Sequence, residues 1–328
     1  MTGQPDDPAF TPPGPAPDPA IDHVAIRAIA DRLLPGTGGP VVSRPASGGT
    51  TPVYRVRRDG TTLYLRLGET AEADLAPEVH VHGRLRALGV RVPEVVSYEP
   101  AHPALGRSVM VTTEIAGEPV GHDDRRVDVG TVLRAAGRDL AVIASVGVDG
   151  FGWVRRDLGI MAGLTAELTT LRAFALGDVE DQLATVSAVL TPARVRAVRE
   201  AVARHDAWFD AGGGVLAHGD FDTTHVYHRD GEYTGIIDFG EIRGADRFYD
   251  LGHFALHDGE RIPVPVAHHL LAGYHEVLAP APDDGSRIHL WKVLIGVRTL
   301  ARLTGRPPGP YRAFLTEAVR RAIDTMPG

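Results

Sequence analysis

The sequence contains no cysteine and almost no lysine. The absence of cysteine excludes disulfides, thiolate metal sites and cysteine nucleophiles from the 328-residue chain. Of the 34 lysines and arginines, only Lys292 is a lysine. Any site that needs a cation is therefore expected to use arginine.

The chain also lacks a surplus of positive charge and a long apolar run. Lysine and arginine number 34 against 42 aspartates and glutamates, a net charge of −8, so no basic surface favours nucleic acid or anionic lipid. No stretch reaches the roughly 18 apolar residues of a membrane span, and the N-terminus has no apolar signal core. We therefore expect a cytoplasmic protein, a monomer or weak dimer, without nucleic-acid or membrane partners. A mildly acidic chain suits a cationic small molecule.

Large apolar residues are scarce at the N-terminus, where proline is frequent. Residues 1–20 contain seven prolines and cannot bury enough apolar surface to become ordered, which predicts a disordered tail. In the chain as a whole, 43% hydrophobic and 23% charged residues are typical of a globular protein. The length favours two domains or lobes.

Helical and strand periodicities alternate along the first half of the chain and become mainly helical in the second. Apolar spacing predicts helices over 21–34, 77–88 and 129–143, from Thr191 onward, and near 264–278, 287–303 and 310–325. Strands are expected near 41–42 and over 53–57, 62–67 and 109–113.

Several side chains that can do chemistry follow a single apolar run. Val215-Leu216-Ala217 leads into a polar bend that carries His218, Asp220, Asp222 and His225. A short buried strand followed by such a bend is a rigid support for a functional loop.

Two further strands follow this bend. They cover residues 226–228 and 233–237, and the pair Asp230-Gly231 between them is typical of a tight hairpin. The second strand ends on Asp238. Asp220 and Asp238 are therefore expected near the same end of a small sheet.

Two carboxylates in this arrangement can divide the work of phosphoryl transfer. One can orient a hydroxyl and accept its proton, and the other can hold Mg²⁺, which prefers oxygen ligands. We assign the first task to Asp220 and the second to Asp238.

The order of these motifs resembles the aminoglycoside phosphotransferase family. Its members carry H-G-D, then an apolar strand that ends in I-D-F/W, then a Y/F-D-L element. This chain shows His218-Gly219-Asp220, Ile237-Asp238-Phe239 and Tyr249-Asp250-Leu251 at matching spacing.

The resemblance implies an α+β, two-lobed protein-kinase-like fold. It has a small antiparallel-sheet N-lobe, expected over 21–112, and a larger, mainly helical C-lobe, expected over 113–328. The resemblance also implies His218 and Asp220 as the catalytic pair and a structural role for Asp250 in bracing the loop.

One position departs from the family pattern. The family's asparagine, usually a second magnesium ligand, is His225 here, and imidazole suits softer metals than Mg²⁺. Direct ligation by His225, a water-mediated contact and a site that relies on Asp238 alone all stay open. Histidine at this place, and an acidic residue such as Glu241 after the metal aspartate, also occur in the related macrolide phosphotransferases.

The resemblance also assigns the nucleotide side of the site. The loop Ser47, Gly48, Gly49 and Thr50 stands in the place of a kinase glycine-rich loop, where backbone N–H groups approach phosphates. Arg66 stands where the family has its phosphate-binding cation, and Glu78 is its expected partner. Backbone groups near Val111 and Thr113 could hold a purine, but they carry no side-chain signature, so the donor is expected to be either ATP or GTP and the choice between them stays open.

Acidic residues after the metal aspartate would suit an acceptor that bears amines. We expect Asp222, Glu241 and Asp246 to contact the substrate, although a loop cap for Asp222 and a solvated surface for the others are alternatives. His253 and His257 are expected to be core or surface histidines.

Four functions fit these patterns. The first is phosphorylation of a small-molecule hydroxyl, on an aminoglycoside-type antibiotic, and the second is a macrolide or metabolic kinase. A nucleotide-binding pseudokinase is the third, motivated by His225. A metal hydrolase built on the histidines and aspartates is the fourth, but it leaves Arg66 and Glu78 unexplained.

Overall fold

The computed structural model describes residues 23–45, 51–121, 127–157, 163–210 and 212–327. The proline-rich residues 1–20 and the loop Ser47, Gly48, Gly49 and Thr50 lie outside these ranges. The chain divides into two compact units. The first runs up to Val79 and includes Glu94–Glu114, and the second comprises His80–Pro93 and Ile115–Gly328.

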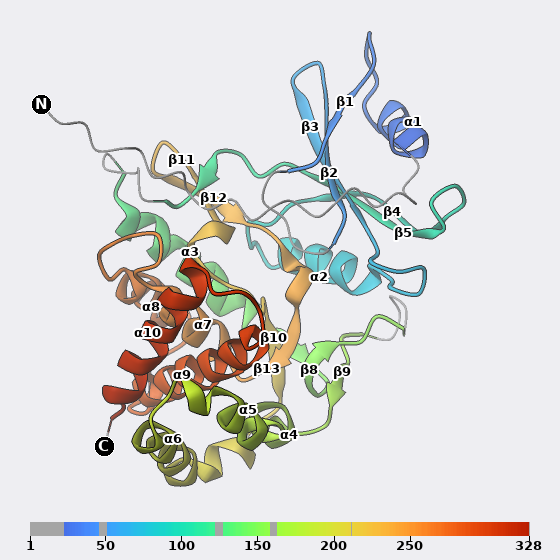
Figure 1. The fold of residues 1–328 in the computed structure, drawn as a ribbon. Coiled ribbons are helices and arrows are strands. Elements are labelled where there is room, and N and C mark those ends of the chain that lie inside the picture. Colours follow the sequence, from blue (N-terminus) through green and yellow to red (C-terminus); the bar gives the residue numbers. More distant parts are fainter. Residues whose placement is uncertain (1–22, 46–50, 122–126, 158–162, 211, 328) are drawn as a thin grey trace, which may run out of the picture. The chain divides into compact units, whose positions relative to one another are not determined.

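The first unit is built on a five-stranded antiparallel sheet of order β1-β2-β3-β5-β4 (Figure 1). Its elements are α1 (His23–Leu33), β1 (Val41–Ser43), β2 (Val53–Arg58), β3 (Thr61–Leu67), β4 (Val95–His102) and β5 (Arg107–Thr113). Ile26 and Ile29 of α1 are buried in one core with Leu63, Leu65 and Leu67 of β3. Because side chains alternate between the faces of a strand, Arg66 lies on the face opposite this core.

The helix α2 (Ala76–Ala87) is shared, because the division between the units falls after Val79. Glu78 in its first turn is buried and belongs to the first unit, whereas Val81 and Leu85 join the core of the second. The expected helix over 77–88 is thus confirmed.

The second unit contains two small sheets and most of the helices. One sheet has the order β7-β10-β13-β8-β9 and the other β12-β11-β6. The strands are β6 (Glu118–Pro119), β7 (Gly147–Val148), β8 (Phe151–Val154), β9 (Ala166–Leu168), β10 (Gly214–Ala217), β11 (Val226–Arg229), β12 (Glu232–Ile236) and β13 (Arg243–Ala245).

The predicted hairpin is confirmed by the antiparallel pairing of β11 with β12. Asp230 and Gly231 between these strands have φ angles of 53° and 82°. Two consecutive positive φ angles match the right-handed twist of the flanking strands, and Asp-Gly is a favoured pair for this turn.

Most of the second unit is helical. Its helices are α3 (Val129–Ile143), α4 (Leu171–Leu176), α5 (Val179–Thr185), α6 (Pro192–Arg204), α7 (Tyr249–His257), α8 (Ala267–His275), α9 (Asp284–Leu303) and α10 (Pro310–Asp324). The helices expected over 129–143, from Thr191 onward and in the last third of the chain are confirmed as α3, α6, α8, α9 and α10.

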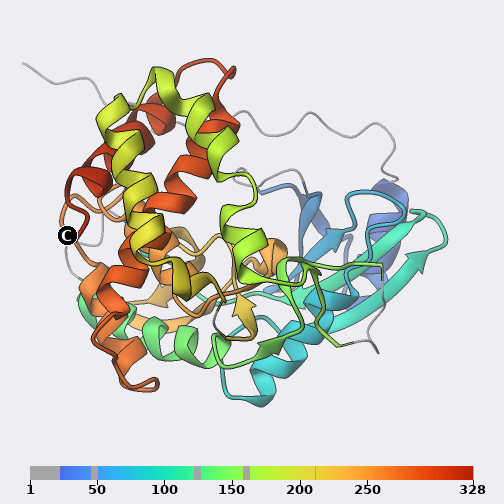
Figure 2. The same ribbon diagram turned by 90° about the horizontal axis from the view of Figure 1, so that it is seen from below.

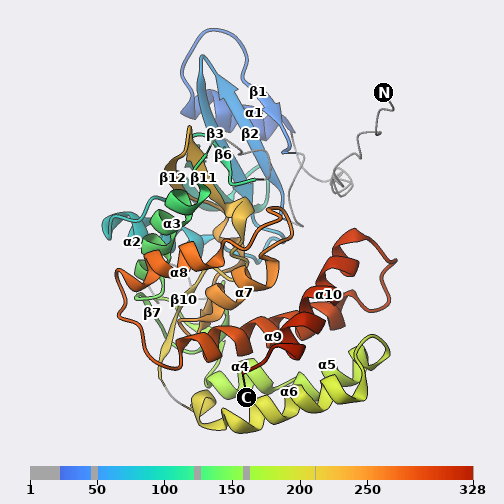
Figure 3. The same ribbon diagram turned by 90° about the vertical axis from the view of Figure 1, so that its left-hand side faces the viewer.

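Helices α5, α6 and α10 pack around α9. Figure 2 shows the yellow-green α5 and α6 alongside the orange-red α9 and α10, and Figure 3 shows α10 and the α4–α6 group on different sides of α9. Helix α7 also packs against α9, and this packing holds α7 in the core of the second unit. None of the described helices has the length and apolar character needed to cross a membrane.

Candidate active site

The loop after β10 carries the H-G-D motif and is anchored to the segment that follows β12. His218 is fully buried, and its Nε2–H donates to the carbonyl oxygen of Ile237 over 2.8 Å. Burial lowers the pKa of His218, so the ring is neutral and acts through this single donor. The bond joins the segment before Asp220 to the segment before Asp238.

Asp250, at the start of α7, braces the same loop. Its carboxylate accepts the backbone N–H of His218 over 2.7 Å and that of Gly219 over 2.9 Å. Asp250 is itself buried. These contacts give Asp250 the structural role that was expected for it.

Replacement of Asp250 by asparagine tests the strength of this brace. The amide offers one acceptor oxygen to two buried N–H groups, and its own NH₂ faces one of them. We expect Asp250→Asn to lower the free energy of unfolding by about 2 kcal/mol, measured by urea denaturation. Asp128→Asn is the matched control, because Asp128 is an exposed N-cap of α3 and asparagine caps equally well. Equal stability of the two variants would contradict the brace.

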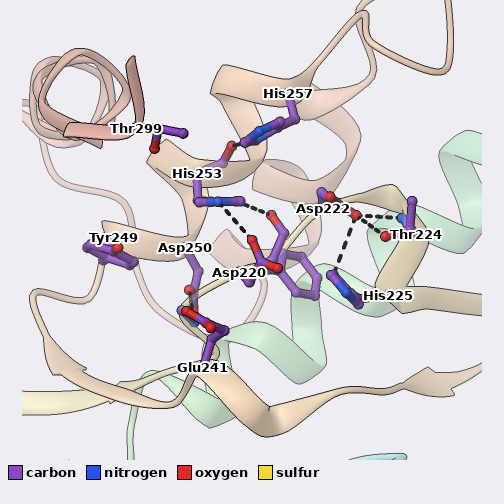
Figure 4. A network of polar contacts seen from close by, with 12 residues as sticks. Asp220, Asp222, Thr224, His225, Glu241, Tyr249, Asp250, His253, His257 and Thr299 are labelled. Atoms are coloured by element: carbon purple, nitrogen blue, oxygen red, sulfur yellow. Dashed lines mark hydrogen bonds and ion pairs between the residues drawn. The ribbon is translucent and has the colours of Figure 1, made fainter. Parts of the chain in front are cut away.

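The side chain of Asp220 is the solvent-exposed group of this otherwise buried H-G-D motif. Its side chain is 52% exposed, and its Oδ1 lies 3.2 Å from Nε2 of the buried His253 (Figure 4). Burial of part of the carboxyl opposes ionisation, but the hydrogen bond and charge of His253 hold the pKa of Asp220 below its ordinary value. The group is therefore a carboxylate, placed where a hydroxyl can reach it.

Glu241, in the short helix Phe239–Glu241, lies near Asp220 in Figure 4. Burial and the charges of Asp220 and Asp238 raise the pKa of Glu241, against the opposing charge of Arg243. Glu241 thus responds to the charges of Asp220 and Asp238, and these three electrostatically coupled groups are called the carboxylate cluster below. Repulsion among three such groups favours the arrival of a cation.

Arg243 is a buried cation beside this cluster. It donates to Glu241 Oε2 over 2.6 Å and to the carbonyl oxygen of Gly219 over 3.3 Å, and it also contacts the Tyr249 hydroxyl. Its guanidinium stacks on Trp153 at 4.2 Å from the ring centroid. Arg243 could not be predicted from the sequence, because the pairing of Ala217 with Arg243 across β10 and β13 leaves no local pattern.

Asp238 suits the magnesium ion that the family implies. It is exposed just after β12, with a left-handed φ of 65°, and Mg²⁺ commonly takes one or two carboxylates and fills its other positions with waters and phosphates. No group of three or more metal-ligating side chains occurs among the described residues. A single exposed carboxylate such as that of Asp238 would fit a magnesium ion whose remaining ligands come from a nucleotide and water.

His225 and Asp222 contact each other. His225 Nδ1 lies 3.4 Å from Asp222 Oδ1, and that oxygen also accepts the Thr224 N–H over 2.7 Å and the Thr224 hydroxyl over 2.5 Å. Asp222 thus caps the short helix Thr223–His225. All of these contacts use Oδ1, so the cap is compatible with a substrate contact through the other carboxylate oxygen.

The first unit holds the residues expected on the nucleotide side. Arg66 on β3 is half-buried and has its Nη2 3.4 Å from Thr51 Oγ1. Glu78 is fully buried. Val111 on β5 is in register with Leu65 of β3 and with Ser97 of β4, and Thr113 donates its N–H to the Glu94 carbonyl over 2.9 Å.

Asp246 makes its contacts elsewhere in the second unit. Its carboxylate accepts the Phe248 N–H over 2.8 Å and lies 3.4 Å from Arg287 Nη1, beside a small cavity lined by Trp208 and Trp291. These contacts do not include the carboxylate cluster.

The antiparallel sheet of one unit and the braced H-G-D loop of the other define a two-lobed, protein-kinase-like α+β fold. The profile of the Phosphotransferase enzyme family matches residues 41–288. The chain belongs to this family, which confirms the predicted fold class and the resemblance on which it was based. It is a phosphotransferase with an alcohol group as acceptor.

Solved structures support the same fold. An aminoglycoside phosphotransferase, APH(4)-Ia, superposes with a TM-score of 0.65 at 16% identity, covering 93% of this chain and 99% of that one. A thermostable mutant of the same enzyme, in a ternary complex with AMP-PNP and hygromycin B, gives 0.63 at 17% identity over 90% and 98%. A choline/ethanolamine kinase family protein from Mesorhizobium loti gives 0.59 at 20% identity over 93% and 95%. None of the curated proteins compared with the chain matches it.

Proposed function

We propose that this phosphotransferase moves the γ-phosphoryl group of ATP or GTP to a hydroxyl of an amine-bearing small molecule of the aminoglycoside type. The observation that carries the proposal is the Asp220 carboxylate, half-exposed on a loop that Asp250 and His218 hold in place. A rigid carboxylate is what the orientation of a hydroxyl requires.

In the proposed reaction Asp220 accepts a hydrogen bond from the acceptor hydroxyl. The hydroxyl oxygen forms a bond to the γ-phosphorus while the bond from that phosphorus to the bridging β–γ oxygen breaks. The hydroxyl proton passes to Asp220 and then to solvent. The products are a phosphate monoester and the nucleoside diphosphate.

The residues proposed to bind the nucleotide belong to the first unit, and Asp238 is proposed to bind its metal ion. Arg66, paired with Glu78, would contact the phosphates, the loop 47–50 would cover them, and backbone groups near Val111 and Thr113 would hold the base. Mg²⁺ on Asp238, with or without His225, would neutralise charge on the phosphates when bound.

Negative charge near Asp220 supports the proposed acceptor class. Glu241 belongs to the carboxylate cluster around Asp220, and Asp222 lies two residues along the same loop. Ammonium groups on the acceptor would relieve the repulsion within this cluster. We propose Glu241 and Asp222 as substrate contacts, with Asp246 as a more remote one, and a cytoplasmic enzyme that could confer antibiotic resistance.

A nucleotide-consumption assay tests the proposal. ATP and GTP are supplied in parallel with Mg²⁺ over aminoglycosides, macrolides and simple amino-alcohols. We expect turnover that depends on an amine-bearing acceptor, with the phosphate monoester identified by mass spectrometry. Turnover with macrolides alone would contradict the proposed aminoglycoside-type acceptor and identify a macrolide kinase instead. Nucleotide binding without turnover for any acceptor would favour the pseudokinase that His225 suggests.

A further inference from the structure

We propose that His253 is a positively charged positioning residue for phosphoryl transfer, which keeps Asp220 ionised and turned toward the acceptor hydroxyl. The inference rests on the proposed function, because it assumes that Asp220 receives that hydroxyl. His253 belongs to none of the motifs that carry the family resemblance.

Helix α7 holds the catalytic loop with two residues three positions apart. Asp250 accepts the backbone N–H groups of His218 and Gly219, and His253 contacts the Phe221 carbonyl and the Asp220 side chain. Residues at i and i+3 lie on one face of a helix. The first residue fixes the backbone of the loop, and the second fixes its reactive side chain (Figure 4).

Both ring nitrogens of His253 face acceptors. Nδ1 lies 3.0 Å from the Phe221 carbonyl oxygen and Nε2 lies 3.2 Å from Asp220 Oδ1. A neutral imidazole has a single N–H and can satisfy only one of them, whereas the imidazolium donates to both. His253 is 7% exposed, and a charge so buried is stable only beside an opposite one.

The neighbouring His257 shows the contrast. Its ring stacks on His253 with centroids 4.5 Å apart, its Nδ1–H donates to the His253 carbonyl over 3.0 Å, and its Nε2 lies 3.2 Å from the Tyr311 hydroxyl. A neutral His257 ring satisfies both contacts, because its one N–H donates to the His253 carbonyl and its other nitrogen can accept the Tyr311 hydroxyl. Burial and the charge of His253 lower the pKa of His257 to about 4. The stacked pair therefore carries one positive charge, on His253.

The charges around His253 favour its cationic form. Negative charges come from Asp220 and Asp222 on the catalytic loop and from Glu260, which follows α7 in the chain. Two further groups lie on the other helices of this region. Tyr311 of α10 is neutral, because burial raises its pKa. Arg302 of α9 is a cation whose charge lowers the pKa values of Glu241 and Tyr311. Although burial opposes the charge, Asp220 and Asp222 raise the pKa of His253.

A cationic partner changes the role of Asp220. One carboxylate oxygen is bound to His253, which leaves the other to accept the hydroxyl. The carboxylate is also a weaker base than an unpaired one, so the hydroxyl proton leaves late, as the new O–P bond forms. Late proton transfer suits the loose transition state of phosphoryl transfer.

The first test is the pH dependence of the single-turnover rate, which reports chemistry and not product release. In His253→Gln, loss of the cation raises the pKa of Asp220. We expect the acidic limb of the profile to move to higher pH by about one unit or more. The fall in rate at alkaline pH that accompanies deprotonation of His253 in the wild type should be absent from the variant. The KM for nucleotide should not change.

His257→Gln is the matched control, because it makes the same substitution one turn further along α7 and removes no charge. Its acidic limb should coincide with that of the wild type. If the His253→Gln profile is only scaled down, without a shift, the residue is merely structural and the proposal fails.

A second measurement does not depend on turnover. Nitrogen-15 NMR of the wild-type protein at about pH 7.5, one unit above the ordinary pKa of histidine, should show His253 with the chemical shifts of an imidazolium, assigned by their absence in His253→Gln. A neutral ring would overturn the inference while leaving the phosphotransferase function intact. An imidazolium in a protein that phosphorylates no acceptor would instead count against the proposed function.

Discussion

Replacing Asp220 by asparagine is expected to lower kcat by about 10²–10⁴-fold, the usual contribution of a general base. Asparagine has nearly the same shape, but it cannot accept the hydroxyl proton, and it leaves the buried His253 without its carboxylate partner. Nucleotide affinity, measured by isothermal titration calorimetry, should stay nearly constant, because Asp220 is assigned to the acceptor and not to the phosphates.

Asp230→Asn provides the matched control for this variant. Asp230 lies in the β11–β12 turn with a positive φ of 53°, a conformation that asparagine also tolerates. Its turnover should equal that of the wild type. Full turnover in Asp220→Asn would remove Asp220 from the role of base and leave the braced loop without a known purpose.

The parts of the site that follow from local sequence were predictable. The β11–β12 hairpin is determined by short apolar runs and an Asp-Gly turn, and both signals lie within residues 226–236. The H-G-D loop was located because an apolar strand precedes it. The brace by Asp250 was expected only through the family resemblance, because Gly219 and Asp250 lie 31 positions apart in the sequence and no local pattern links them.

The residues that were missed depend on contacts between distant segments. Periodicity does not show which strands pair, so the register of Ala217 with Arg243 could not be inferred and Arg243 was overlooked. The three-residue β9 (Ala166–Leu168) is too short to show alternation. His253 was expected to be a core or surface histidine, and it is buried as core residues are, but its ring contacts Asp220. Its spacing of three from Asp250 on one helix was the signal that could have revealed it.

Gly219 should be the least replaceable residue of the catalytic loop. Its φ is +93°, and the Cβ of an alanine there would lie 1.8 Å from the Glu241 carbonyl oxygen. The backbone conformation alone costs about 1–2 kcal/mol for a residue with a side chain, and the overlap with backbone must be relieved by moving one of the two segments. We expect Gly219→Ala to lower the free energy of unfolding by about 3 kcal/mol or more, measured by urea denaturation.

Gly305→Ala separates the two causes of this loss. Gly305 has a similar φ of +87°, but apart from its chain neighbours no atom of the described residues lies within 4 Å of the added methyl group, so it carries the conformational cost without the overlap. The control should lose about 1–2 kcal/mol and keep its turnover. In Gly219→Ala the segments that carry Asp220 and Glu241 must move apart, and a displacement of about 1 Å can cost 10²-fold in rate. If Gly219→Ala is as stable and as active as Gly305→Ala, the loop is compliant, and the rigidity on which the proposed role of Asp220 depends does not exist.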